Sequence, residues 1–171
     1  MIKTSLALIM IVLMTSGCEE KYNYDGCHEP IMISQKVLRA KYPKVEAGKT
    51  IGKAAKIYNY KDGEILLINE RNKGIHVVNN HIKHKVTQGD YFINIPGNVD
   101  MAVKNGYLYA DSFSDLVVFD IRDISNIKVL SRKDSVFALD IRQAVRDDET
   151  KNKCYMSDKD LEDKFIIGYK E

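Results

Sequence analysis

Tryptophan is absent from this chain, and proline and cysteine occur only three times each. So few cysteines exclude a disulfide-dense miniprotein. A strong excess of one charge is lacking too, because the chain has 26 Lys and Arg residues and 24 Asp and Glu residues. The net charge of +2 predicts no uniformly basic surface for nucleic acid. What is present, 44% hydrophobic and 29% charged residues in a chain of 171, is the composition of one ordinary globular domain.

Long hydrophobic runs are also lacking. The longest is Leu6–Met14, with nine residues, whereas a transmembrane helix needs about 20. A lysine precedes the run and small residues follow it, as in a secretory signal peptide. The next residues, Thr15-Ser16-Gly17-Cys18, resemble the lipobox of bacterial lipoproteins, although the family favours an aliphatic residue at the first of these positions. Residues 1–17 are therefore predicted to be a lipoprotein signal peptide, with an ordinary signal peptide and a chance cysteine as the alternative.

The lipobox resemblance implies that Cys18 carries acyl chains such as palmitate. Each buried methylene contributes ~0.8 kcal/mol, so two or three chains hold a protein at a membrane almost irreversibly. Residues 18–50 are expected to contain this anchor, a polar tether and a short helix at Ser34–Lys41 behind a serine N-cap. A second short helix or turn is expected at Leu139–Arg146. The predicted location is the bacterial cell envelope, at the periplasmic or surface face of the outer membrane.

Once Cys18 carries lipid, Cys27 and Cys154 are the remaining thiols. Beyond the cytoplasmic membrane such a pair is free to form a disulfide. The bond would close a loop of about 127 residues and stabilise the fold by up to about 4–5 kcal/mol on the chain-entropy model. Two unpaired cysteines are the alternative, because the sequence does not give the distance between the sulfur atoms. Neither residue belongs to a C-x-x-C motif of the kind used in redox or zinc sites.

From residue 52 onward, short apolar runs alternate with turn signals, which is the pattern of β-strands. Asp62-Gly63 and Asn105-Gly106 are strong hairpin signals because their residues tolerate positive φ, and they lie 43 residues apart. The apolar strand that follows each hairpin repeats at an offset of 41. The predicted strands are 56–60, 64–68, 75–79 and 90–95 in the first unit, and 99–104, 107–110, 116–120 and 127–132 in the second.

A period of 41–43 residues built from four strands is typical of a β-propeller blade. Residues 116–120 (LVVFD) resemble the strand that gives the LVIVD repeat its name, a propeller repeat of bacterial and archaeal cell-surface proteins. Residues 96–103, 107–111 and 69–77 resemble the neighbouring stretches of LVIVD-repeat lipoproteins, whereas His76 and Asn79 depart from the family pattern.

The resemblance covers about residues 52–132. It implies a mainly β fold of antiparallel, propeller-like blades, with two recognisable four-stranded units at 51–95 and 96–133 and short flanking helices. A chance succession of hairpins in a small sandwich is the alternative.

Residues 134–171 are expected to form a C-terminal segment in which 165–169 is a strand that opens a further blade. A propeller closes with about four to eight blades, and two blades leave strand edges unpaired. Three explanations stay open: a truncated gene product, a short family member that closes its blades between subunits as a homo-oligomer, and a compact two-sheet fold.

Three of the four histidines, His76, His81 and His84, lie within nine residues. Three histidines can hold zinc and activate water, but their spacing is not that of a helical H-E-x-x-H motif, and a solvated loop explains them as well. Residues 157–163 carry alternating acids without the glycine and distal glutamate of an EF-hand, and Ser157 with Asp160 better fits a helix N-cap.

Aspartates recur at blade positions and could line one rim, but turn formation explains them as well. Asp120 follows an apolar strand and is expected to accept backbone N–H groups of the next turn. The other three are Asp100, Asp111 and Asp115. No nucleophile elbow, nucleotide loop or supported carboxylate pair appears, so we assign no catalytic residue and no cofactor.

The sequence therefore predicts a non-catalytic envelope lipoprotein, held at the membrane by its lipid, whose β scaffold binds a protein or a glycan and not nucleic acid. The alternative is an envelope-associated hydrolase or metal-binding protein that uses the region of His76, His81 and His84.

Overall fold

The computed structural model describes residues 26–80, 88–138, 161 and 163–170. This part of the chain is mainly β. The elements are β1 (Pro30–Ser34), α1 (Gln35–Lys41), β2 (Lys44–Ala47), β3 (Ala54–Tyr60), β4 (Ile65–Glu70), β5 (Gly74–Asn79), β6 (Tyr91–Asn94), β7 (Met101–Lys104), β8 (Tyr107–Ser112), β9 (Asp115–Asp120), the 3-10 helix η2 (Ile124–Asn126), β10 (Lys128–Lys133) and β11 (Lys164–Tyr169).

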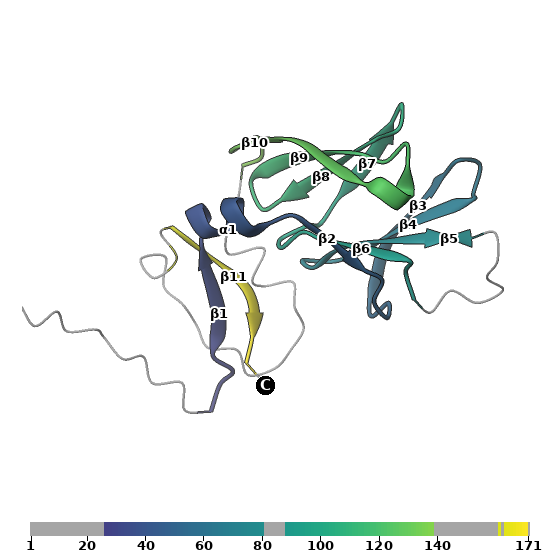
Figure 1. Cartoon of the computed structure of the whole chain (residues 1–171). Helices are drawn as coiled ribbons and strands as arrows, with labels where there is room; N and C mark the ends of the chain where they lie inside the picture. The colour runs from purple at the N-terminus through teal and green to yellow at the C-terminus, as the bar shows by residue number, and fades with distance from the viewer. Residues whose placement is uncertain (1–25, 81–87, 139–160, 162, 171) are drawn as a thin grey trace, which may run out of the picture.

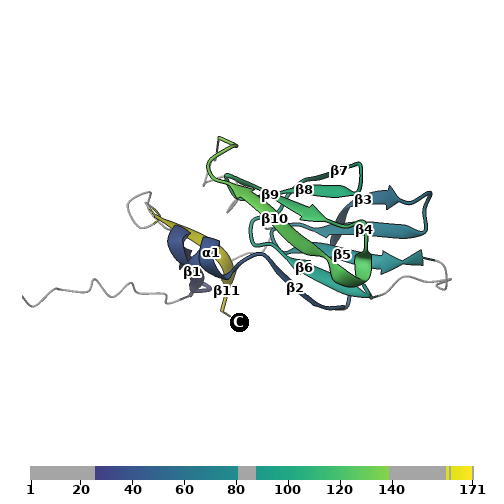
Figure 2. The same ribbon diagram turned by 45° about the horizontal axis from the view of Figure 1, so that its top comes forward.

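The described strands form three antiparallel sheets. Sheet 1 has five strands in the order β2-β6-β5-β4-β3, sheet 2 has four in the order β10-β9-β8-β7, and a terminal sheet pairs β1 with β11. Sheets 1 and 2 lie against each other, and the terminal sheet with α1 lies at one end of the pair (Figures 1 and 2). The described sheets do not close into a ring.

All eight strands predicted for the two repeat units are present, and each unit is a four-stranded meander in sequence order. Both predicted hairpins form. Lys61, Asp62 and Gly63 in the first have φ of 51°, 53° and 90°, and Asn105 and Gly106 in the second have φ of 53° and 80°. The first connection spans residues 61–64 and the second only 105–106. The two turn signals lie 43 residues apart, whereas β4 and β8 begin 42 residues apart. Sheet 1 also gains β2, a strand that the repeat did not predict.

The main core lies between sheets 1 and 2. Leu67 and Val77 of sheet 1 are fully buried in it, as are Val117 and Phe119 of sheet 2. The whole buried cluster comprises Ile65, Leu67, Ile75, Val77, Ile93, Ile95, Leu108, Ala110, Val117, Phe119 and Ile121. When β4 and β8 are aligned from their first residues, Leu67 corresponds to Tyr109. Leu67 faces the shared core, whereas Tyr109 lies between two core residues of β8 and therefore faces away from sheet 1. The two units thus contribute opposite faces to the core, which means that they stack in the same orientation.

The terminal sheet brings the two ends of the described chain together. The strand predicted at 165–169 is β11, and its partner is β1, so within the described residues it belongs to neither larger sheet. Helix α1 begins after Ser34, whose side chain accepts a hydrogen bond from the backbone N–H of Val37 at 3.4 Å, which confirms the predicted N-cap. Nowhere among the described residues is there a helix with the length and apolarity needed to cross a bilayer.

Several sequence predictions fall outside the described residues. These are the signal peptide, the lipid-bearing Cys18, the second helix at 139–146 and the N-cap at Ser157. Cys27 is disulfide-bonded. Because Cys154 is not among the described residues, its pairing with Cys27 stays a prediction.

Candidate functional site

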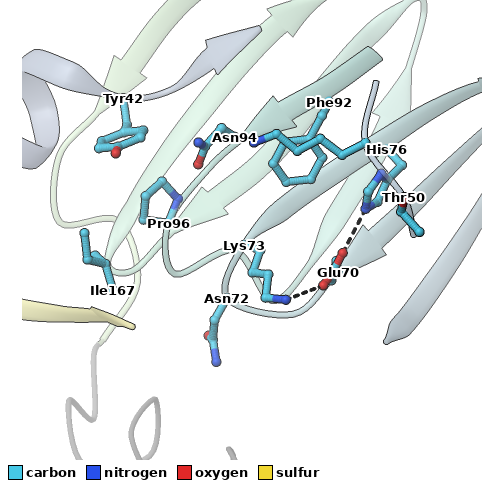
Figure 3. Close-up of a pocket in the computed structure, with 11 residues that line it drawn as sticks. Tyr42, Thr50, Glu70, Asn72, Lys73, His76, Phe92, Asn94, Pro96 and Ile167 are labelled. Atoms are coloured by element: carbon cyan, nitrogen blue, oxygen red, sulfur yellow. Dashed lines mark hydrogen bonds and ion pairs between the residues drawn. The ribbon is translucent and has the colours of Figure 1, made fainter. Parts of the chain in front are cut away.

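A cavity of about 350 Å³ opens where sheet 1 meets the terminal sheet. We call it the Glu70 cavity. It is lined by Tyr42, Lys49, Thr50, Glu70, Asn72, Lys73, His76, Phe92, Asn94, Pro96 and Ile167. Figure 3 shows Tyr42 and Ile167 at one end of the cavity, near the terminal sheet, and His76 of β5 with Thr50 of the segment after β2 at the other end.

Glu70 and His76 form a buried pair at the floor of this cavity. The turn after β4 aligns Glu70 with Gly74, so His76 lies two residues further along β5 on the same face of the sheet. The left-handed φ of Asn72 (63°) and Gly74 (145°) makes this turn tight enough for Lys73 to reach back to Glu70. The carboxylate accepts from Nε2 of His76 at 2.9 Å, from Nζ of Lys73 and from the backbone N–H of Gly52 at 3.4 Å.

Glu70 is held as an anion despite its burial. Burial raises the pKa of this carboxyl, but the hydrogen bonds from Lys73 and His76 and the positive charge of Lys73 outweigh it, so its pKa lies below the ordinary 4.5. An ionised carboxylate only accepts hydrogen bonds, so Nε2 of His76 carries a hydrogen. Both carboxylate oxygens of Glu70 therefore have partners within the protein.

The His76 ring is packed as well as hydrogen-bonded. The side chain is 1% exposed, and its ring lies 4.7 Å from that of Phe92 at an interplanar angle of 50°. Nδ1 of His76 is buried and has no hydrogen-bond partner among the described residues. His81 and His84 lie outside that part of the chain, and within it no three His, Cys, Asp or Glu side chains are grouped to hold a metal ion.

A second ion pair lies beside the cavity. Glu46 of β2 accepts from Nζ of Lys49 at 2.5 Å and from Nδ2 of Asn94 at 3.0 Å. These two hydrogen bonds lower the pKa of Glu46 below its ordinary value. Nζ of Lys49 also lies 4.7 Å from the centroid of the Phe92 ring, a cation–π contact. Each lysine that lines the cavity is thus neutralised by its own carboxylate.

The repeat aspartates all have structural partners. Oδ1 of Asp120 accepts from the backbone N–H of Arg122 at 3.1 Å, which confirms the predicted turn, and the Arg122 side chain holds the pKa of Asp120 at about 2. Oδ1 of Asp111 accepts from the backbone N–H groups of Val99 at 2.8 Å and Asp100 at 2.9 Å. Asp100 in turn pairs with Lys56 at 2.6 Å.

Asp115 has a different role, which the sequence did not indicate. It is 2% exposed and accepts two hydrogen bonds from Arg39 of α1, from Nε and Nη2, both at 2.8 Å. Arg132 of β10 donates a third at 2.8 Å, and the backbone N–H of Ser135 a fourth at 3.0 Å. This cluster joins α1 to sheet 2. No local pattern could reveal it, because Arg39 and Asp115 are 76 residues apart.

Sequence reasoning considered His76 only as a metal ligand in the alternative function and did not single out Glu70, Lys73, Lys49 or Asn94. The signal for Glu70 was present: once the hairpin is placed, strand alternation puts it on the face of His76. The contributions of Tyr42 and Ile167 depend on the terminal sheet and had no such signal.

Comparison with known proteins adds no relative. No protein-family model matches the chain, and neither a curated protein nor a solved structure matches it.

Proposed function

We propose that this chain is a membrane-anchored envelope lipoprotein that carries a non-catalytic β scaffold of LVIVD-repeat type and binds a protein or glycan. The observation that carries this proposal is the structural use of the buried and half-buried carboxylates. Glu70, Asp111 and Asp115 all accept hydrogen bonds from donors within the protein. A general base has to take a proton from a substrate, whereas the hydrogen bonds that these three carboxylates accept hold parts of the fold together.

The architecture supports a scaffold. Two four-stranded meanders pack in the same sense on one apolar core, as successive blades of a propeller do. The proposal includes membership of the repeat family and closure of the blades into a propeller, within one chain or between subunits. The Glu70 cavity then provides the binding site, since ligand sites are concave and combine apolar walls with a few placed polar groups.

The membrane anchor is tested by replacing Cys18 with alanine. The C18A variant should lose fatty-acid labelling and pass from the membrane to the soluble fraction, because the lipid supplies the attachment. The matched control is Thr15→Leu, which restores the aliphatic residue usual at that lipobox position and should keep labelling. Unchanged membrane retention of C18A would overturn the lipoprotein assignment.

The metal-binding alternative has its own test. A metal at His76 would have to use Nδ1, because Nε2 is bonded to Glu70. The protein purified without chelators should contain no stoichiometric zinc. Bound zinc that is lost on replacing His81 and His84 would favour the alternative.

A further inference from the structure

We infer that the Glu70 cavity binds a neutral saccharide of one or two sugar rings. This inference rests on the proposed binding function and names its ligand class. Three features of the cavity lead to it: its compensated charge, its division into apolar and polar walls, and buried polar atoms that lack hydrogen-bond partners.

Charge compensation argues against an ionic ligand. Lys73 is paired with Glu70 and Lys49 with Glu46, so the cavity has charged groups but little uncompensated charge. An anionic or cationic ligand would meet a like charge beside each opposite charge, so it would gain little net attraction. A neutral hydroxylated ligand meets no such repulsion, and the three donors of an ammonium group and the roughly four acceptor positions of a carboxylate leave capacity for further hydrogen bonds.

The walls of the cavity differ in polarity. Tyr42, Pro96 and Ile167 form an apolar side near the terminal sheet, and Asn72, Lys73 and Asn94 carry polar groups nearby (Figure 3). A sugar ring has the same two aspects, because its C–H groups form an apolar face and its hydroxyls form a polar rim. Aromatic and amide side chains next to each other therefore suit a sugar ring better than they suit a wholly apolar ligand.

Two polar atoms at the cavity lack hydrogen-bond partners. Oδ1 of Asn72 and Nδ1 of His76 are buried and have no partner among the described residues. Asn72 Oδ1 needs a donor, and Nδ1 of His76 accepts a hydrogen bond in a neutral ring and donates one in a charged ring. A buried polar atom without a partner is unfavourable. A hydroxyl group both donates and accepts, so a ligand with several O–H groups can satisfy both atoms.

The volume limits the size of the ligand. About 350 Å³ lies at the lower end of the roughly 300–1,000 Å³ of ligand pockets, which suits one or two rings and not a long glycan chain.

The test is saturation-transfer NMR with the full chain in detergent micelles. The neutral probes are methyl β-glucoside, cellobiose and N,N′-diacetylchitobiose, and the charged probes are glucuronic acid and glucosamine. We expect saturation transfer to at least one neutral probe and none to the charged ones. Failure of all neutral probes, or binding of charged probes only, would overturn the inference.

Two variants locate the site. Asn72→Gly removes the amide while tolerating the left-handed φ of 63°, and Lys73→Met alters a side chain that is 67% exposed. Each should weaken binding at least about tenfold. The matched control is Asn105→Gly, at another left-handed position (φ 53°) outside the cavity lining, which should bind as the wild type does. Unchanged binding in both cavity variants would place the site elsewhere and refute the inference.

The saccharide inference and the proposed function can fail independently. If no neutral saccharide binds while C18A still leaves the membrane, only the ligand class fails. If a probe binds and its spectrum shows hydrolysis, the saccharide inference holds and the non-catalytic proposal fails.

Discussion

Phe113 and Phe165 stack with their ring centroids 4.2 Å apart and their planes at 17°. Phe113 lies in the turn between β8 and β9 with a left-handed φ of 55°, and Phe165 lies on β11. Together with Ile33 and Leu38 they form a second core, separate from the one between the large sheets. This stack and the cluster around Asp115 attach the terminal sheet and α1 to sheet 2.

The stack predicts a strict requirement for glycine at position 97. Gly97 has a φ of 74°, and a Cβ there would lie 2.5 Å from the Phe113 ring. Gly97→Ala should therefore lower the free energy of unfolding by about 3 kcal/mol or more, from backbone strain plus displacement of Phe113. Urea unfolding measures this change. Gly63→Ala is the matched control: φ is 90° and nothing lies within 4 Å, so only about 1–2 kcal/mol of backbone strain is expected. Equal losses in the two variants would argue against the contact.

Removing the charge of Asp115 should destabilise the protein. Asp115→Asn leaves Arg39 and Arg132 without their shared anion in a mostly buried site. We expect the free energy of unfolding at pH 7 to fall by about 2–4 kcal/mol. Asp62→Asn, in an exposed turn, should change it by less than about 0.5 kcal/mol. A loss at Asp115 no larger than at Asp62 would show that the cluster contributes little.

The Asp115 effect should depend on pH in a stated direction. Burial raises the pKa of Asp115, but the hydrogen bonds from Arg39 and Ser135 and the charges of both arginines bring it below the ordinary 3.8. A group with a lowered folded-state pKa stabilises the fold above its unfolded pKa, and this is lost as pH falls through the folded pKa. The stability difference between wild type and Asp115→Asn should be full above about pH 5 and shrink below about pH 4. A constant difference across that range would contradict the argument.

Asp111 should show the opposite slope. Burial raises its pKa above the ordinary 3.8 even though its carboxylate accepts backbone N–H bonds. Ionisation of Asp111 therefore costs folding free energy above its folded pKa, and that cost disappears as pH falls through it. Relative to Asp111→Asn, the wild type should gain stability toward acid pH, measured by urea unfolding between about pH 6 and pH 3. A parallel loss at Asp111 and Asp115 would contradict the two pKa directions.

The predicted disulfide can be tested at Cys154. Cys154→Ser should shift electrophoretic mobility under non-reducing conditions only and lower the free energy of unfolding by about 2–5 kcal/mol. The wild type treated with reductant is the control and should show the same mobility as the variant. Identical mobility of variant and wild type without reductant would rule out the Cys27–Cys154 bond.

The strands of the two repeats were predictable because their signals are local. Asp62-Gly63 and Asn105-Gly106 set the hairpins, and the apolar runs beside them can pair only with their neighbours. The serine cap of α1 is local for the same reason. Inside the repeats the predicted strand ends shift by at most two residues, and β4 begins at Ile65, one residue later than predicted, because the first turn runs to Glu64.

The remaining features depend on contacts between distant segments. β2 is a short run, KVEA, whose strand state comes from pairing with β6, and β11 finds its partner in β1. The Glu70 cavity is formed by the turn at Asn72 together with residues of the terminal sheet, so no single stretch of sequence predicts it.

The pairing of β1 with β11 also bears on the distance between the Glu70 cavity and a membrane. His28 and Glu29 both bond to Lys170, so the start and the end of the described chain meet at the terminal sheet. On the proposal that Cys18 is the lipid anchor, the eight residues from there to Gly26 span at most about 28 Å. The proposed anchor would therefore keep the Glu70 cavity close to the bilayer, and a longer tether would let the same fold bind ligands farther from it.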